Sequence, residues 1–143
     1  NVLIWQAIIV GTEAEIVGGV SALSKAEQAR DILLQAQKID PLALDGIGFV
    51  LLGSLYSKVP GWPLGFGDKK QARICFEKAI DINKDGVDQN FFYGRFLYEN
   101  GALAKAKYIL NRGLNAKVRK GYEIADLGRK QQIKELLGKI NKR

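Results

Sequence analysis

Apolar residues recur along this chain at intervals of three and four positions, the spacing that lines one face of an α-helix. The segment 123–141 shows the pattern most plainly, with Ile133, Leu136, Leu137 and Ile140 on one stripe and Lys and Arg residues elsewhere. No stretch alternates apolar and polar residues for long enough to form a strand. The pattern therefore predicts an all-α fold, with helices over 2–14, 24–39, 43–58, 68–83, 87–100, 102–116 and 123–141.

Local signals predict where several of these helices begin and end. Ser24 and Glu27 have the spacing of a capping box, and Asp68 is placed to cap the helix that follows it. Asp85 and Asp88 are expected to cap the next helix. Gly101 suits a left-handed stop at a helix C-terminus. Pro41 suits a linker or a first helical turn.

Small residues return in step along the chain. Ala72-x3-Phe76-x2-Ala79 is followed 34 residues later by Ala106-x3-Leu110-x2-Gly113, and Ala29-x3-Leu33-x2-Ala36 precedes both. Gly53 and Gly94 occupy matching places in the helices before the last two of these segments. Close crossing of paired helices requires small side chains at such positions. The pattern and its period resemble those of tetratricopeptide (TPR) proteins.

The resemblance to TPR proteins implies a single domain over 1–143 that forms an α-α superhelix. It would hold about three helical hairpins, at approximately 1–41, 42–85 and 86–118, and a C-terminal capping helix over 122–141. Two positions depart from the family pattern: Lys84 replaces the usual closing proline, and Gly113 replaces the usual alanine.

Two inserts interrupt the repeat. Gly53 and Ala72 are 19 residues apart where the common spacing is 12, and the excess falls in 58–67, a segment with two Pro, three Gly, Trp62 and Phe66. A second excess falls at 15–22, so we expect extended loops on one edge of the solenoid. Trp62 is either an exposed binding anchor, or it folds back with Phe66 to fill a groove between helices. We slightly favour the second interpretation.

The resemblance also places candidate partner-binding residues on the first helix of each repeat. These are Ser54 and Lys58 in the second repeat and Asp88, Phe91, Arg95 and Tyr98 in the third, together with Trp62 and Phe66 from the insert. A mixed polar and aromatic lining suits a bound peptide. The alternative is structural: Arg95 pairs with Asp88 or Glu99 along its helix, and Tyr98 belongs to the core. Too few cations are present for the carboxylate clamp of chaperone-binding TPR domains.

Composition narrows the class of function. The chain has no histidine and one cysteine, Cys75, so it lacks the residues of a Ser-His-Asp triad, a Cys-His pair or a cysteine-rich metal cluster. We expect no enzymatic activity, no cofactor and no metal. Cys75 is expected to be a buried apolar residue.

The net charge of +7 is uneven. Nine Lys/Arg against Glu123, Asp126 and Glu135 give residues 117–143 a charge of +6. A basic segment of this kind is compatible with nucleic acid, anionic lipid or an acidic partner, but a solvated terminal helix is the simpler interpretation, and we expect no nucleic-acid partner. No apolar stretch is long enough for a membrane span. Residues 2–10 are apolar all round, so we expect an upstream helix or a partner to cover them.

Three longer strings, 52–68, 85–94 and 125–129, resemble exported bacterial TPR proteins related to the TPR component associated with TRAP-type solute transporters. This resemblance implies a periplasmic scaffold that lacks its signal and one upstream helix pair, with a solute-binding protein or another envelope protein as partner. A cytoplasmic location and a homo-oligomer stay open. The alternative function is a small-molecule carrier whose pocket is lined by Trp62, Phe66, Phe91 and Tyr98.

Overall fold

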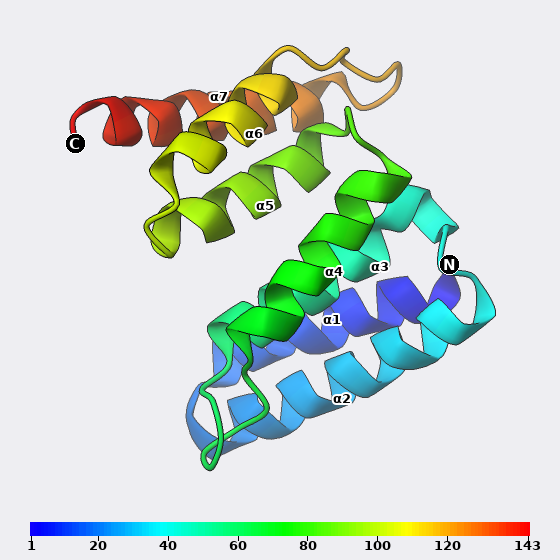
Figure 1. Cartoon of the computed structure of the whole chain (residues 1–143). Helices are drawn as coiled ribbons and strands as arrows, with labels where there is room; N and C mark the ends of the chain where they lie inside the picture. Colours follow the sequence, from blue (N-terminus) through cyan, green and yellow to red (C-terminus); the bar gives the residue numbers. More distant parts are fainter. The chain divides into compact units, whose positions relative to one another are not determined.

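The computed structural model describes residues 1–143, and all of its regular structure is helical (Figure 1). The only β-type contact is an isolated bridge between Gly61 and Gly67. The elements are α1 (Val2–Val17), α2 (Gly19–Ile39), the 3-10 turn η1 (Ala43–Gly46), α3 (Ile47–Lys58), α4 (Lys69–Ile82), α5 (Val87–Glu99), α6 (Leu103–Leu114) and α7 (Glu123–Asn141). The predicted all-α fold is confirmed. None of the helices is both long and apolar enough to cross a lipid bilayer.

The helices form two compact units, which are described separately: unit 1 covers Asn1–Ile82 and unit 2 covers Asn83–Arg143. In unit 1, α1 packs on α2, α2 on α3 and α3 on α4. One buried apolar cluster of its core contains a residue from each of the four helices, namely Ala7, Leu33, Leu52 and Cys75. The cysteine is a buried free thiol, as expected.

Unit 2 is a bundle in which α5, α6 and α7 all contact one another. The apolar stripe of α7 faces the other two helices, and Ile133 has no exposed surface. Gly94 of α5 and Leu110 of α6 lie at a close crossing, where a β-carbon on Gly94 would lie 2.5 Å from the leucine side chain. Small residues thus permit close helix packing here, as the sequence pattern predicts.

The predicted loop at 15–22 is wrong. Helix α1 continues to Val17 and α2 begins at Gly19, so a single residue separates them. Gly18 and Gly19 both have positive φ values, 67° and 66°, which glycine adopts without steric cost. The extra residues therefore lengthen the two helices. Ser24 lies inside α2, so its predicted capping box is also wrong.

The other helix ends give mixed outcomes. Asp68 caps α4 as expected, because its Oδ1 accepts hydrogen bonds from the backbone N–H groups of Lys70 (2.9 Å) and Gln71 (3.1 Å). Gly101 has φ 80° at the end of α5, also as expected. The predicted helix 43–58 begins only at Ile47, since Leu44 and Asp45 adopt left-handed backbone angles in η1.

The predicted caps of α5 are wrong. Its N-cap residue is Gly86, which has no side chain, so Asp85 does not cap the helix. Asp88 lies in the first turn, where its carboxylate pairs with Arg129 of α7 instead of capping the backbone.

Candidate functional site

The loop at 59–68, which we call the Trp62 loop, joins α3 to α4 in unit 1 and is held by its own backbone. The N–H of Gly67 donates to the carbonyl of Pro60 (2.9 Å), and the N–H of Leu64 donates to Gly61 (3.1 Å). A further bond from the N–H of Asp68 to the carbonyl of Tyr56 (2.9 Å) ties the loop to α3. Figure 1 shows the loop projecting beyond the ends of α3 and α4.

Glycine is required inside this loop because backbone segments approach closely. A β-carbon at position 67 would lie 1.8 Å from the carbonyl oxygen of Val59, a distance at which backbone atoms must move. The Trp62–Pro63 peptide bond is cis. The sequence expectation of a compact, specific loop is consistent with this hydrogen bonding and close packing.

The two aromatic residues of the loop behave differently. Phe66 folds back: its ring meets Tyr56 edge-on at a centroid distance of 5.8 Å, and the guanidinium carbon of Arg30 lies 4.4 Å from its centroid. Trp62 is 90% exposed. The interpretation in which both rings fill a groove is therefore wrong for Trp62 and right for Phe66. The backbone hydrogen bonds hold the loop, so its conformation does not depend on packing of the indole.

An open pocket of about 610 Å³ lies beside the Trp62 loop, between the end of α1, the start of α2 and the end of α3. Small side chains leave this space empty, and the only charged lining residues, Glu15 and Lys58, lie 3.6 Å apart. The lining residues are Gly11, Ala14, Glu15, Gly19, Val20, Ala22, Leu23, Ala26, Leu55, Lys58, Val59, Pro60 and Leu64. The two segments expected to be long loops thus share one edge of unit 1, although only one of them is a loop.

The four residues predicted to line a carrier pocket, Trp62, Phe66, Phe91 and Tyr98, do not line this one. Trp62 and Phe66 do not line this apolar pocket, because the first is turned to solvent and the second packs on Tyr56 and Arg30. Phe91 and Tyr98 belong to unit 2. Of the predicted binding residues of the second repeat, Lys58 lines the pocket and Ser54 does not; Ser54 is half-buried in α3, where its carbonyl accepts a bond from Ser57 (2.9 Å).

The predicted residues of the third repeat are all on α5. Phe91 is only 4% exposed, so its expected place on an open groove is wrong. Arg129 of α7 lies over its ring at 4.9 Å and explains the burial. Tyr98 is half-buried, with the guanidinium carbon of Arg143 4.7 Å from its ring centroid.

The structural alternative for Arg95 is an ion pair with Asp88 or Glu99, and only the pair with Glu99 is found. The Nε of Arg95 lies 3.9 Å from Glu99 Oε1, one helical turn away, and its guanidinium flanks the rings of Phe91 and Phe92. Asp88 does not take part. Its Oδ1 lies 2.8 Å from Arg129 Nε, and its Oδ2 lies 3.6 Å from Arg119 Nη2. These two contacts connect α5 to α7 and to the α6–α7 loop. Arg95 and Tyr98 stay predicted partner-binding residues.

Helix α1 exposes a second apolar face. Val2, Trp5, Ile9 and Ile16 recur at helical spacing, and all are more than half exposed. They lie opposite Ile4 and Ala7, which face the core. The apolar residues of this helix thus extend beyond its packed face, and their cover by an upstream helix or a partner stays a prediction.

Cys75 and Asp126 are two of the ionisable groups whose pKa values are shifted by their surroundings. Burial raises the pKa of the Cys75 thiol to about 11, so the reactive thiolate is disfavoured at neutral pH. Hydrogen bonds from Arg119 lower the pKa of the Asp126 carboxyl, which is 1% exposed. Both groups are better explained as structural than as catalytic. No cluster of three or more Cys, Asp and Glu side chains is placed to hold a metal ion.

No protein-family model matches the chain, and no curated protein sequence is similar to it.

Proposed function

We propose that this chain is a non-catalytic helical-repeat scaffold of the TPR type that binds a protein partner through its Trp62 loop. The repeat assignment is supported by residues that recur 34 positions apart and have equivalent roles. Ala72 and Ala106 are both fully buried, and Phe76 and Leu110 each fill the space above a glycine of the preceding helix, Gly53 and Gly94.

The observation that carries the function is an exposed tryptophan on a constrained backbone. Trp62 and its neighbour Leu64 are 90% and 74% exposed, while hydrogen bonds and close glycine packing fix the segment that bears them. Tryptophan is among the residues that contribute most to binding at protein interfaces. A loop that is already ordered loses little conformational entropy when a partner binds.

The proposed setting is the bacterial periplasm, with a solute-binding protein of a TRAP-type transporter or another envelope protein as partner. This part rests on the resemblance of the strings 52–68, 85–94 and 125–129 to exported bacterial TPR proteins. The strings include the whole Trp62 loop, so the segment that carries the resemblance is also the segment that presents the exposed indole.

Site-specific photocross-linking tests the scaffold. The photoreactive residue benzoylphenylalanine is introduced at Trp62 and, as a matched control, at Tyr108, an exposed aromatic position of unit 2. The proposal expects a defined product with a co-expressed TRAP-type solute-binding protein from position 62 and none from position 108. Equal labelling from both positions, or no product from position 62, contradicts it.

A second candidate function is the carriage of an apolar small molecule, and the apolar pocket beside the Trp62 loop favours it. Its volume of about 610 Å³ lies within the common range of ligand sites, and most of its lining is apolar. Ala22→Phe should fill the pocket, whereas Ala125→Phe on the exposed face of α7 is the control. Binding of a fluorescent fatty acid that is lost only in Ala22→Phe would favour the carrier. An unchanged signal would exclude it.

A further inference from the structure

Unit 2 has a pocket of about 610 Å³ whose charged residues are mostly cationic. It lies where the turn before α5 meets the end of α6 and the loop that follows. Its walls are formed by Asn83, Asp85, Gly86, Val87, Arg112, Asn115, Ala116, Lys117 and Arg119. Three of these residues are cations, and the single acid among them, Asp85, is solvent-exposed.

A fully buried amide holds the central cation of this pocket. Asn90 of α5 is 0% exposed, and its Nδ2 donates to the carbonyls of Lys84 and Gly86, both at 2.8 Å. These two bonds leave Oδ1 to accept from Arg112 Nε at 2.9 Å. The position of the Arg112 guanidinium is therefore set by a residue that two hydrogen bonds to the backbone already fix.

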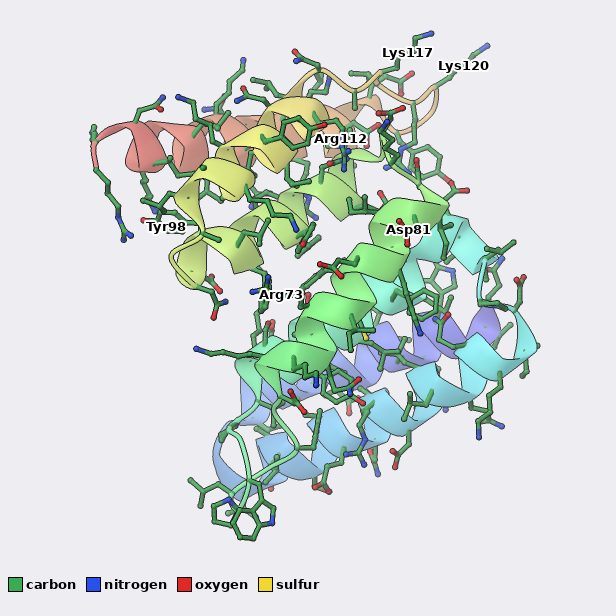
Figure 2. All side chains as sticks on the ribbon, in the orientation of Figure 1. Arg73, Asp81, Tyr98, Arg112, Lys117 and Lys120 are labelled. Carbon is green, nitrogen blue, oxygen red and sulfur yellow. The ribbon has the colours of Figure 1, made fainter.

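The guanidinium of Arg112 is incompletely paired. Its Nη2 is buried and has no hydrogen-bond acceptor in the protein, and its guanidinium carbon lies 5.7 Å from the ring centroid of Tyr108. A buried donor of a charged group is costly to leave unpaired, so a small rotation of the guanidinium that brings Nη2 to an oxygen bound in the pocket would be favoured. Figure 2 shows Arg112 extending from the end of α6 toward the turn that precedes α5.

Helix α7 fixes the opposite wall. Buried Asp126 accepts hydrogen bonds from the backbone N–H of Arg119 (2.9 Å), from its Nε (3.1 Å) and from its Nη2 (2.6 Å). Lys130, which is also on α7, donates a hydrogen bond to the carbonyl of Ala116 in the loop. The charge of Arg119 is thus satisfied internally. Lys117 is exposed on the same loop, and its side chain extends into solvent (Figure 2).

We propose that this pocket binds the phosphate monoester group of a small molecule. Arg112 and Lys117 are two cations without acidic partners, and a phosphate monoester carries close to two negative charges at neutral pH. Asn83 and Asn115 also line the pocket, and their side chains carry amide donors of the kind that bind phosphate oxygens. Gly86 and Val87 also place the first turn of α5, the positive end of its helix dipole, in the wall. The volume leaves room for the organic part of the ester.

The test uses the full chain, with glycerol 3-phosphate as the probe and glycerol and sodium acetate as controls at matched ionic strength. Backbone amides of 83–87 and 112–117, and the Nε–H group of Arg112, are followed in ¹H–¹⁵N spectra. Glycerol 3-phosphate should shift these resonances in a saturable manner, whereas neither control should do so. The Arg112 Nε–H signal is the sharpest readout because Asn90 already holds that group.

Three variants connect the binding to the pocket. Arg112→Gln should weaken binding about tenfold or more, because it removes a hydrogen-bonded charge. Lys117→Ala should weaken it about threefold, as expected for a more exposed charge. Lys120→Ala is the matched control: this lysine lies on the same loop but does not line the pocket, so its affinity should stay within about 1.5-fold of the parent.

Several results would overturn the proposal. One is a response to glycerol 3-phosphate no larger than the response to acetate. Another is an equal effect of Lys117→Ala and Lys120→Ala, which indicates only general attraction to a basic surface. If Arg112→Gln does not fold, the comparison of the two lysine variants decides the question. Binding to phosphatidic acid vesicles without binding to glycerol 3-phosphate also contradicts a small-molecule site.

Discussion

The closest helix crossing in unit 2 allows a direct test of the packing argument. Gly94→Ala would add a β-carbon 2.5 Å from both Cγ and Cδ2 of Leu110, a side chain with no exposed surface. Normal carbon–carbon contacts lie near 3.5–4.0 Å, so α5 and α6 must separate by about 1 Å or Leu110 must leave its rotamer. Overpacking of this kind costs about 1–3 kcal/mol.

A control variant separates this clash from the intrinsic effect of the substitution. In a helix interior, replacing glycine by alanine stabilises by about 1 kcal/mol when nothing else changes. Gly128 lies inside α7, and an added β-carbon there meets nothing within 4 Å. Both variants therefore share the propensity gain, and only Gly94→Ala has the clash. The two free energies of unfolding should differ by about 1–3 kcal/mol, with Gly128→Ala more stable than the parent.

Urea unfolding followed by far-ultraviolet circular dichroism measures this difference. Both tryptophans, Trp5 and Trp62, lie in unit 1, so fluorescence reports on that unit and serves as an internal comparison. Equal stabilities of Gly94→Ala and Gly128→Ala would refute the reasoning. That result would mean that the glycine at 94 is not needed for the crossing.

Three other outcomes follow from the structure. Hydrogen bonds from Arg119 lower the pKa of Asp126, so this pair stabilises the fold above about pH 4, and the contribution is lost as the pH falls further. The melting temperature of Asp126→Asn should therefore fall less steeply in acid than that of the parent. Cys75, buried and with a pKa raised to about 11, should react with a disulfide reagent at pH 8 only after urea is added. In a Trp5→Phe variant, acrylamide should quench Trp62 nearly as strongly as a free indole, and a protected emission would contradict its exposure.

Most of the helical framework is predictable because it depends on local periodicity. The stripe of α7, the cap at Asp68 and the stop at Gly101 each require only a few neighbouring residues, and all are found. The sequence predicts an extended loop at 15–22 and not the tight turn at Gly18, because an alignment to a regular repeat assigns extra residues to loops. A glycine with positive φ reverses the chain in one step, and the extra residues extend the helices instead.

The site residues depend on contacts between distant parts of the chain, so the sequence predicts them poorly. Phe91 has the residue type and register of a groove position, yet Arg129, 38 positions later, covers it. The pairing of Arg112 with Asn90 spans 22 positions and has no local signal. The charge pattern of the sequence places Lys117 and Arg119 in one basic segment. It does not show that Asp126 neutralises Arg119 and leaves Lys117 unpaired.

The two units differ in charge in a way that separates the two proposals. Up to Ile82 the chain has eight Lys/Arg and nine Asp/Glu, whereas from Asn83 onward it has fourteen and six, which gives net charges of −1 and +8. Contacts of the apolar Trp62 loop with a partner should therefore depend weakly on salt, because apolar burial is not screened. Phosphate binding in unit 2 should weaken as sodium chloride rises from 0.05 to about 0.5 M, since screening shortens the reach of its cations. If cross-linking at position 62 fell with salt as steeply as glycerol 3-phosphate binding, the partner would be recognised by charge, and the role given to the exposed indole would be wrong.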